Sequence, residues 1–501
     1  MDKFPLLVIA TALYWIACLI IGVYASKTKV KKPSDYFLAG GGLGTIVVSF
    51  AMMATVFSAW FILGHQGSLW ANGAKYLVHF IHIPLMGVMS AMLFPRIWAI
   101  ARKNEYITMA EMYGSYWSSE LLRVLVVIVG ALYAVPYVAL QLRGAGLTFE
   151  VLSGGKIPAA KGAIVLGIVV VLYVFLGGLK AAAITDTLQG ALLVLASILL
   201  GATAVGAIMQ LNPDISFFQA FGNGIKSAGD GYLTLGKLGE IWSWPYIATI
   251  AITTMGIYTS PPYMMLVASA KSPKVFKFQG FIIMTIVMGA MYYIFSALVG
   301  MGGRSIITKL ASSDQLSLEL VFNHMGAVPF LITSLGILAA MNSTAAGYLA
   351  NTSTILSRDL YTRYINPNAS AKKQVFVGRM MVLGIVAVSV VFSLVVLDYL
   401  VMIGTLATAF GIQLLPAMIG ITFVRKISKT GINAGIICGS ITVALTYFVW
   451  PHPLGIHQGG WGLLVNIICV VVGSILTQAP GKEALKKTHA LFDKTVLEDN
   501  N

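Results

Sequence analysis

Long apolar runs divide this chain so regularly that they determine what it can fold into. Thirteen stretches are apolar and long enough to cross a lipid bilayer, and they lie near residues 5–25, 43–63, 76–100, 121–148, 160–178, 182–209, 245–267, 277–302, 327–356, 376–398, 401–423, 432–450 and 461–477. Backbone groups in hydrocarbon must bond to one another, so each run is expected to be an α-helix. The sequence therefore predicts an all-α polytopic membrane protein with about thirteen transmembrane helices.

The overall composition supports this class. The 501 residues are 58% hydrophobic and only 10% charged, with a mean hydropathy of +0.85, whereas a soluble domain has about 25% charged residues. The first run continues directly into the rest of the chain, so no cleavable signal peptide is expected. Cys18, Cys438 and Cys469 all fall within apolar runs and indicate no disulfide framework.

The net charge of +15 is explained by where the basic residues lie. If the N-terminus is outside, the inside segments hold 24 of the 33 lysines and arginines, and such an excess is typical of cytoplasmic loops. We therefore expect a multi-pass protein of the cell's inner (plasma) membrane with a cytoplasmic C-terminus. No nucleic-acid partner and no obligatory protein partner is inferred. Residues 1–480 are expected to form one transmembrane domain, and residues 481–501 a short cytoplasmic tail.

Two of the apolar runs, the second and the seventh, are interrupted and occupy corresponding places in two halves of the chain. The second run follows three consecutive glycines at 40–42, and the seventh contains Pro261 and Pro262. Adjacent prolines remove backbone donors and break helical bonding. Paired interrupted helices are typical of transporters built from inverted repeats, here about residues 43–209 and 245–423.

Polar groups also interrupt the ninth run. Ser343 and Thr344 follow the small residues Ala339 and Ala340, so two hydroxyl groups lie where another backbone can approach closely. Hydroxyl groups in hydrocarbon cost free energy unless they find partners. Neutral oxygens suit a hard cation such as Na⁺, but Ser and Thr also bond to their own helix or join two helices. The residues alone leave both readings open.

Three motifs make the chain similar to a known family. They are Phe37-Leu-Ala-Gly with Gly44, Ala54, Ser58 and Gly64 downstream, the segment from Gly177 to Gln189 (GGLKAAAITDTLQ), and the stretch with Ala340, Ser343, Thr344 and Asp359-Leu-Tyr. On these motifs the chain resembles the sodium:solute symporter family over about residues 5–480. The resemblance implies the leucine-transporter fold, a 5+5 inverted repeat in which ten core helices are the second to the eleventh run.

The same resemblance implies a sodium site made of five oxygens. Its ligands would be the carbonyl groups of Ala54, Phe57 and Ala340 and the hydroxyl groups of Ser343 and Thr344. Val56 stands where the sodium/proline symporter has an aspartate, so a weaker affinity for sodium is expected, without loss of the site.

Three ionisable residues inside apolar runs have two readings each. Asp186 costs about 2.5–3.5 kcal/mol in a membrane segment, and the resemblance implies a second sodium site or an exit step, whereas its place near the start of the 182–209 run favours a helix cap. His79 and His82 share one helix face. They either line the cavity, as in sugar-transporting relatives, or bond helix to helix. A zinc site is not expected without further ligands.

The fourth run contributes Tyr137, Gln141 and Arg143 as candidates for the solute cavity. Arg143 would suit a carboxylate, but we favour the reading in which its long side chain extends to the outer surface. The other residues expected to line the cavity are Ser58, Trp60, Phe61, Gln66, Tyr258, Ser260, Thr408 and Gln413.

We therefore expect a secondary active transporter that carries a small organic solute with Na⁺, its co-transported ion, by alternating access across the lipid bilayer. The candidate cavity residues include few acids, and residues 136–144 (PYVALQLRG) resemble the monocarboxylate branch, so a small monocarboxylate or other organic anion is expected. A proline-like amino acid or a vitamin is the alternative. An enzyme is not expected, because the ionisable residues are too scattered. A transporter-like membrane sensor is the alternative of another class.

Overall fold

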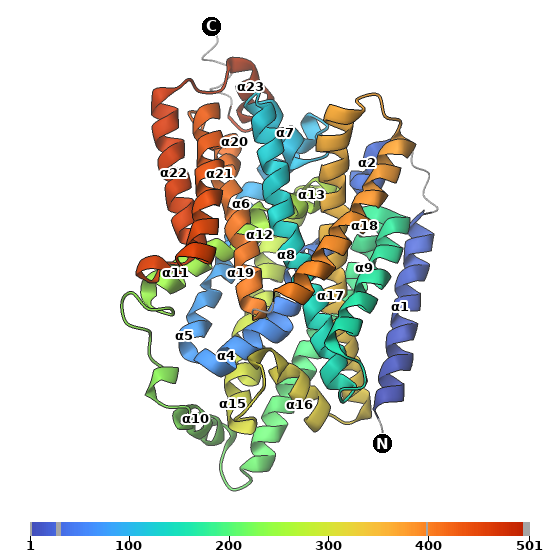
Figure 1. Cartoon of the computed structure of the whole chain (residues 1–501), viewed down its shortest axis with the longest axis vertical. Helices are drawn as coiled ribbons and strands as arrows, with labels where there is room; N and C mark the ends of the chain where they lie inside the picture. Colours follow the sequence, from blue (N-terminus) through green and yellow to red (C-terminus); the bar gives the residue numbers. More distant parts are fainter. Residues whose placement is uncertain (1–2, 27–31, 397–398, 494–501) are drawn as a thin grey trace.

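The computed structural model describes residues 3–26, 32–396 and 399–493, which form a bundle of helices (Figure 1). The first half contains α1 (Phe4–Ser26), α2 (Pro33–Phe37), α3 (Thr45–Val56), η2 (Trp60–His65), α4 (Gln66–Asn72), α5 (Ala74–Leu77), η3 (Val78–Ile81), α6 (His82–Lys103), α7 (Met109–Tyr116), α8 (Glu120–Leu152), α9 (Ala159–Leu211) and α10 (Phe217–Ser227). The start of α1 and the helix α23 lie at opposite ends of the bundle (Figure 1).

The second half of the chain is also helical. It contains α11 (Trp244–Thr254), α12 (Gly256–Thr259), α13 (Pro261–Ser269), α14 (Val275–Phe278), η5 (Gln279–Met288), η6 (Met291–Phe295), η7 (Ala297–Met301), α15 (Gly302–Ile306), α16 (Leu316–His324), α17 (Ala327–Ile355), η9 (Leu356–Ile365), α18 (Ala371–Val395), α19 (Leu400–Gly411), η10 (Ile412–Leu414), α20 (Leu415–Thr422), α21 (Lys429–Ala444), η11 (Leu445–Val449), α22 (Gln458–Leu476) and α23 (Lys482–Lys487). Within the described residues, the only strand-like pairing is an isolated bridge between Leu43 and Ala270.

The described helices are consistent with the thirteen predicted runs. Ten helices are long and apolar enough to cross a membrane, and α3 with the η2–α4 segment makes an eleventh, bent by 51°. The helix α9 has 53 residues, about twice the length that one crossing needs, and it is broken at Gly178, where φ is +58°. A Cβ atom there would lie 2.8 Å from the Tyr36 ring, so only glycine fits. The helices α11 to α13 form the seventh predicted run.

Both runs that were predicted to be interrupted are broken, the seventh at the Pro261–Pro262 pair that the sequence indicates and the second after Val56, inside the run and not at the glycines that precede it. The helix α3 ends at Val56, and Phe57 has extended backbone angles (φ −74°, ψ 98°). In the seventh run Ser260 is extended (φ −67°, ψ 137°), and Pro261 then begins α13 at the position where a missing N–H costs least. The two breaks therefore leave helix ends with unpaired backbone groups inside the bundle.

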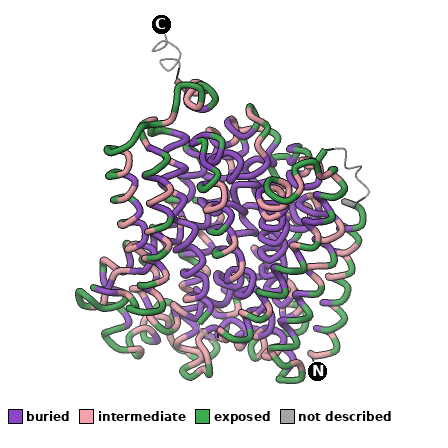
Figure 2. The backbone as a smooth tube through the Cα atoms, turned by 45° about the horizontal axis from the view of Figure 1, so that its top comes forward, coloured by how far each residue is buried: buried purple, intermediate pink, exposed green. Residues whose placement is uncertain are grey.

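The centre of the bundle is buried, and the outward faces of the peripheral helices are exposed (Figure 2). The helix α17 is buried at nearly every position from Gly336 to Ile355 and packs on α3, α8, α9 and α18. By contrast, one face of α1 exposes large apolar side chains, among them Ile9, Leu13 and Ile20. Such a face is suited to lipid.

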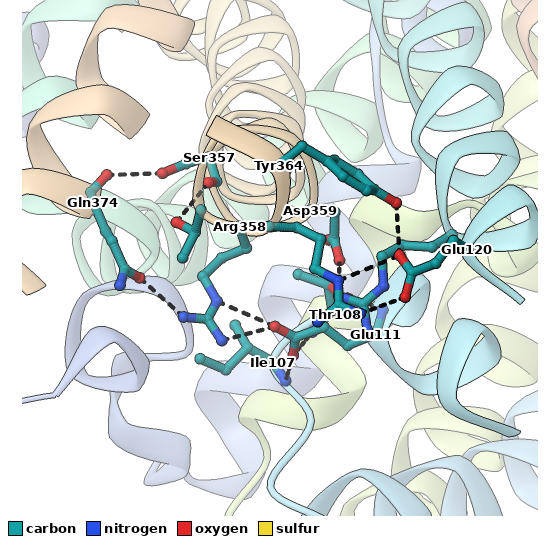
Figure 3. A network of polar contacts seen from close by, with 12 residues as sticks. Ile107, Thr108, Glu111, Glu120, Ser357, Arg358, Asp359, Tyr364 and Gln374 are labelled. Atoms are coloured by element: carbon teal, nitrogen blue, oxygen red, sulfur yellow. Dashed lines mark hydrogen bonds and ion pairs between the residues drawn. The ribbon is translucent and has the colours of Figure 1, made fainter. Parts of the chain in front are cut away.

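Ion pairs tie α7, α8 and η9 together at the end of the bundle where the C-terminus lies (Figure 3). The pairs are Arg358–Glu111 at 2.7 Å, Arg123–Asp359 at 3.3 Å, and Arg363–Glu120. Glu111 also accepts a hydrogen bond from the Ile107 amide, and Thr108 caps α7. These contacts fix the loop that connects α6 to α8.

Two segments outside the core also have helical structure. The segment between α9 and α11 contains α10, which is amphipathic. The tail after Pro480 forms only the six-residue α23, followed by a turn in which His489 is buried against Tyr116. Within the described residues, the tail is docked on the bundle from Lys487 to Asp493.

Candidate functional site

The break in the first interrupted span exposes a row of carbonyl oxygens at the end of α3. The amide of Ala59 donates to the Gln141 side chain on α8 at 2.9 Å, and the amide of Trp60 donates to the Ser58 hydroxyl at 3.1 Å. These two bonds satisfy the first amides of the outer segment. The Met53 carbonyl still accepts from the Phe57 amide at 2.8 Å, whereas the carbonyls of Ala54 and Thr55, in the last turn of α3, face the Thr344 hydroxyl of α17.

The hydroxyl groups of Ser343 and Thr344 lie against these carbonyls. Ser343 Oγ is 3.1 Å from the Ala54 oxygen and 3.0 Å from the Ala340 oxygen. Thr344 Oγ1 is 3.1 Å from the Ala54 oxygen and 3.3 Å from the Phe57 oxygen. All five residues are fully buried. The structure thus brings together the five oxygens that the sequence analysis selected.

The chemistry of this set favours a cation. Two hydroxyl groups carry only two protons, yet they face the carbonyls of Ala54, Thr55, Phe57 and Ala340, so lone pairs outnumber donors. The negative end of the α3 dipole lies at the same point. Converging neutral oxygens in a dry pocket are the ligands that a hard cation takes. The residues therefore fit Na⁺.

Asp186 lies deep inside α9 and caps nothing. It follows the break at Gly178 by eight residues, is 1% exposed, and its Oδ1 has no hydrogen-bond partner. The reading as a helix cap is therefore wrong, because the helix resumes directly after Gly178, well before Asp186. One turn further on, Gln189 donates to the Tyr14 hydroxyl at 2.7 Å, which also accepts from Asn342 at 3.1 Å. The side-chain oxygens of Gln189 and Asn342 are likewise without partners.

Rings from four helical segments pack into one cluster beyond the break. Trp60 stacks on His65 with centroids 5.3 Å apart and meets Tyr137 at 6.2 Å. His79 lies 5.8 Å from His65 and 4.6 Å from His82. Phe61 joins this cluster through its ring contact with Tyr292, and Ser58 joins it through its contact with the Tyr137 hydroxyl. This ring cluster unites six of the predicted cavity residues: Ser58, Trp60, Phe61, His79, His82 and Tyr137.

The two predicted histidines also join helices. His79 Nε2 lies 3.0 Å from the Thr254 hydroxyl on α11, and His82 Nδ1 lies 2.8 Å from the His79 carbonyl. The helix-to-helix reading is thereby confirmed for His79, while both rings still face the cluster. Within the described chain, no group of three His, Cys, Asp or Glu side chains is placed to hold a metal ion.

The sequence analysis missed His65, Tyr76, Tyr292 and Tyr348. His65 is fully buried and bonds to the Tyr76 hydroxyl, and Tyr348 lies 4.9 Å from the Tyr137 ring. A signal for His65 was present, since a histidine directly before Gln66 in a broken span is a polar group in hydrocarbon. The two tyrosines at 292 and 348 lie in apolar runs where nothing distinguishes them from core residues.

Several other predicted lining residues face elsewhere, so their assignment to the cavity is corrected. Arg143 donates to the Val396 carbonyl at 3.1 Å, at the end of α18. Gln413 accepts a hydrogen bond from Asn466 on α22, and Tyr258 accepts from Gln279 on η5. Gln66 donates to Ser296 on the segment between η6 and η7.

The remaining three candidates bond mainly to backbone. The side-chain hydroxyls of Ser260 and Thr408 donate to carbonyls of their own segments, at Ile257 and Thr405. Gln141, as described, holds the break in the first span, and its amide nitrogen donates to the Tyr137 carbonyl at 2.9 Å. The role of Gln141 is therefore to position the carbonyl row.

Comparison with known proteins finds similarity to solute transporters, among them sodium symporters. The family model described as "Sodium:solute symporter family" matches residues 36–439. The osmoregulated proline transporter OpuE of Bacillus subtilis (strain 168) is 26% identical, over 96% of this chain and 96% of its own length. A sodium/proline symporter of Staphylococcus aureus (strain bovine RF122 / ET3-1) is 25% identical, over 94% of this chain and 93% of its own. A solved structure of a Na⁺-coupled sialic acid symporter in a substrate-bound outward-open state superposes with a TM-score of 0.77, at 17% identity, over 96% of this chain and 99% of that one.

Proposed function

This chain belongs to the sodium:solute symporter family, and we propose that its cargo is a small carboxylate, carried into the cell with Na⁺ by alternating access. The family consists of transporters and not of enzymes, and its members are coupled to sodium. The proposal adds the solute class, the residues and the orientation, with the N-terminus outside and the C-terminus in the cytoplasm.

The observation that carries the proposal is the hydroxyl pair of Ser343 and Thr344 aimed at the α3 carbonyls. Oxygens from α3 and α17 belong to different halves of the fold, so a bound Na⁺ would hold the two halves together. Asp186, with the unpartnered oxygens of Gln189 and Asn342, is proposed as a second cation site or exit step.

The chemistry of the ring cluster supports an anionic group on the solute. The cluster presents hydroxyl groups and imidazoles from Ser58, Tyr137, His65 and His79, and none of its members is acidic. Ser58 directly follows Phe57, so a carboxylate bound there would lie beside the proposed Na⁺, which supplies the positive charge. Arg143 is not needed for this role.

An amino acid such as proline is the second candidate. Two relatives that match nearly the whole chain are named for proline transport. Proline also carries a carboxylate, so the same position beside Na⁺ would serve it, and an added ammonium group would need an acceptor such as the Tyr137 or Ser58 oxygen.

A thermal-shift assay of the purified protein tests the solute class. Pyruvate, lactate, proline and glucose are each added with sodium chloride and with choline chloride. A ligand at a hundredfold excess over Kd stabilises the folded state by about 2.7 kcal/mol. We expect pyruvate or lactate to raise the unfolding temperature only with sodium. Stabilisation by proline or glucose alone would contradict the monocarboxylate, while leaving sodium coupling intact.

A further inference from the structure

The inner ends of the two broken spans are joined directly to each other. The Leu43 amide donates to the Ser269 carbonyl at 3.2 Å, and the Lys271 amide donates to the Leu43 carbonyl at 2.9 Å. Leu43 lies just before α3, and Ser269 ends α13. A solute leaving the bundle toward this end must separate these segments or pass beside them. We call residues 41–43 with 269–271 the inner constriction.

Two side chains of α6 hold the inner constriction from outside. Trp98 Nε1 donates to the Ala270 carbonyl at 2.7 Å. Arg102 donates from one nitrogen to the Gly41 carbonyl and, at 3.3 Å, to the Ala270 carbonyl. Gly41 has φ +64°, and a Cβ atom there would lie 2.3 Å from the guanidinium. The absence of a side chain at Gly41 is therefore what allows Arg102 to reach both carbonyls.

Arg102 also lines a cavity of about 340 Å³ beneath the inner constriction. Its charged lining residues are Lys32, Arg102 and Arg358, opposed by Glu105. Arg358 is already paired with Glu111 (Figure 3). Arg102 is exposed to the cavity, and in the described parts of the chain it forms no ion pair; its partners are the two neutral carbonyls and the Trp98 ring, whose centroid lies 5.7 Å away.

We propose that this cavity is an anion subsite, in which Arg102 binds the carboxylate of the solute and in doing so releases the inner constriction. The inference rests on the proposed function, since it takes the solute to be a carboxylate. A carboxylate engages a guanidinium through two charge-assisted bonds, which are stronger than bonds to neutral carbonyls. Because Arg102 uses the same nitrogen for Gly41 and Ala270, it cannot keep both partners and turn fully toward the anion.

The subsite gives Arg102 two states with different consequences. With the cavity empty, the guanidinium joins the segment before α3 to the residue that follows α13, and the constriction is held closed. With a carboxylate present, only Trp98 and the two backbone bonds remain. A ligand that binds the second state better shifts the equilibrium toward it. The solute would thus promote its own release, and the same solute added from the cytoplasm would hold the exit open.

Thiol labelling of the full-length protein in nanodiscs tests this directly. Ala268 lines the cavity and is only 7% exposed, so Ala268→Cys reports opening. The labelling rate of the introduced thiol with a polar maleimide is followed by mass spectrometry at constant sodium. Pyruvate and proline are the probes, each compared with its amide, which lacks the carboxylate. We expect the acids to raise the rate at least threefold and the amides to leave it unchanged.

Three variants separate the effect of the Arg102 charge from an effect on the fold. In Arg102→Ala the labelling rate should be high already without an acid and should not respond to one. Gly41→Ala keeps the charge but displaces the guanidinium from the carbonyls, so its basal rate should also be high. Lys103→Ala, which removes the exposed neighbouring charge of α6, should behave as the parent.

Three results would overturn the inference: equal stimulation by acid and amide, no stimulation by either acid, or an unchanged response in Arg102→Ala. Uptake by the same preparations in vesicles is measured separately. Absence of sodium-dependent uptake would remove the proposed function, whereas sodium-dependent uptake with an unresponsive thiol would remove only the subsite.

Discussion

Thr344 makes the most specific contribution of any single residue to the candidate sodium site. Its hydroxyl lies within 3.4 Å of three carbonyl oxygens of α3, those of Ala54, Thr55 and Phe57. One proton cannot serve three acceptors. A hydroxyl that only stabilised its own helix would bond four residues back, as Thr354 does to Ala350 at 2.8 Å. Thr344 and Thr354, both on α17, therefore give a direct comparison of a ligand with a structural hydroxyl.

Thr344→Ala should raise the half-saturating sodium concentration of uptake by about tenfold, because the loss of one neutral contact costs about 0.5–1.5 kcal/mol and a cation ligand costs at least that. Ser343→Ala should act in the same direction. Thr354→Ala is the matched control, since it removes a buried hydroxyl of the same helix away from the carbonyl row. The sodium dependence of uptake by vesicles is the measurement. An unaltered dependence in both Thr344→Ala and Ser343→Ala would favour the structural reading.

The contacts of individual side chains are what the sequence predicted least well. The five oxygens were selected because a motif identified them, and the break placed them together. Gln413 and Tyr258 were assigned to the cavity, but they face α22 and η5. In a fully buried helix every face is apolar, so periodicity does not tell which neighbour a polar side chain meets. That depends on helix rotation, which tertiary packing alone determines.

Among the elements, the C-terminal tail is docked on the bundle, whereas the sequence predicted only a short tail. His489 lies 3.0 Å from the Tyr116 hydroxyl of α7 and 3.2 Å from the Gly420 carbonyl of α20. Burial lowers the pKa of His489 below its usual range, and the nearby Arg425 and Arg96 lower it further, against Asp493. The docked tail therefore prefers the neutral imidazole.

Docking of the tail should weaken in acid. A lowered pKa in the docked state means that the contribution to stability is complete above about pH 6.5 and is lost as the pH falls through the lowered value. Hydrogen-exchange protection of residues 482–493, corrected for intrinsic rates, should therefore fall between pH 7.5 and pH 5. His489→Gln should remove most of this change. Equal protection at both pH values in the parent protein would contradict the role of His489.

A second element contains a carboxyl group whose pKa is raised, the opposite direction to the shift of His489. Asp314, in the turn η8 (Ser313–Gln315) before α16, is 2% exposed and accepts a hydrogen bond at 3.0 Å from the Leu400 amide at the start of α19. Burial raises its pKa to about 6, although the Leu400 amide and Arg143 act in the other direction. The folded state consequently binds a proton more readily than the unfolded chain.

This carboxyl should make the protein more stable as the pH falls from 7 to 5, by about 1.3 kcal/mol. The difference in unfolding temperature between the parent and Asp314→Asn should therefore move in favour of the parent as the pH falls. Differential scanning calorimetry in detergent measures it. If the difference is the same at both pH values, Asp314 is already ionised and solvated in the fold.

Element boundaries were predicted well where the signal is local. Pro261 and Pro262 predicted the second break, and the three glycines preceded α3, because backbone donors and φ angles are properties of single residues. The break at Gly178 was expected only as a gap between two runs. The docking of the tail depends on contacts with α7 and α20 that lie hundreds of residues away in sequence, and no local pattern indicates them.

For the molecule as a whole, the hydrophobic runs predicted the helical membrane architecture, because their length follows from the thickness of the bilayer. The orientation inferred from the basic residues stays a prediction. The potential and the sodium gradient across the membrane determine the energetics of transport. One Na⁺ that moves through a potential of about 100 mV supplies about 2.3 kcal/mol, and a tenfold sodium gradient adds about 1.4 kcal/mol. One co-transported ion therefore sustains a solute gradient of several hundredfold.

Accumulation of solute in proteoliposomes tests the account most directly. Vesicles that contain the purified protein receive labelled pyruvate or proline with a sodium gradient and an inside-negative potential, and matched vesicles receive choline in place of sodium. The account predicts accumulation far above equilibrium with sodium and only equilibration with choline, and a loss of the sodium response in the Ser343→Ala, Thr344→Ala double variant. Undiminished accumulation in choline, or a double variant that responds to sodium as the parent does, would contradict it.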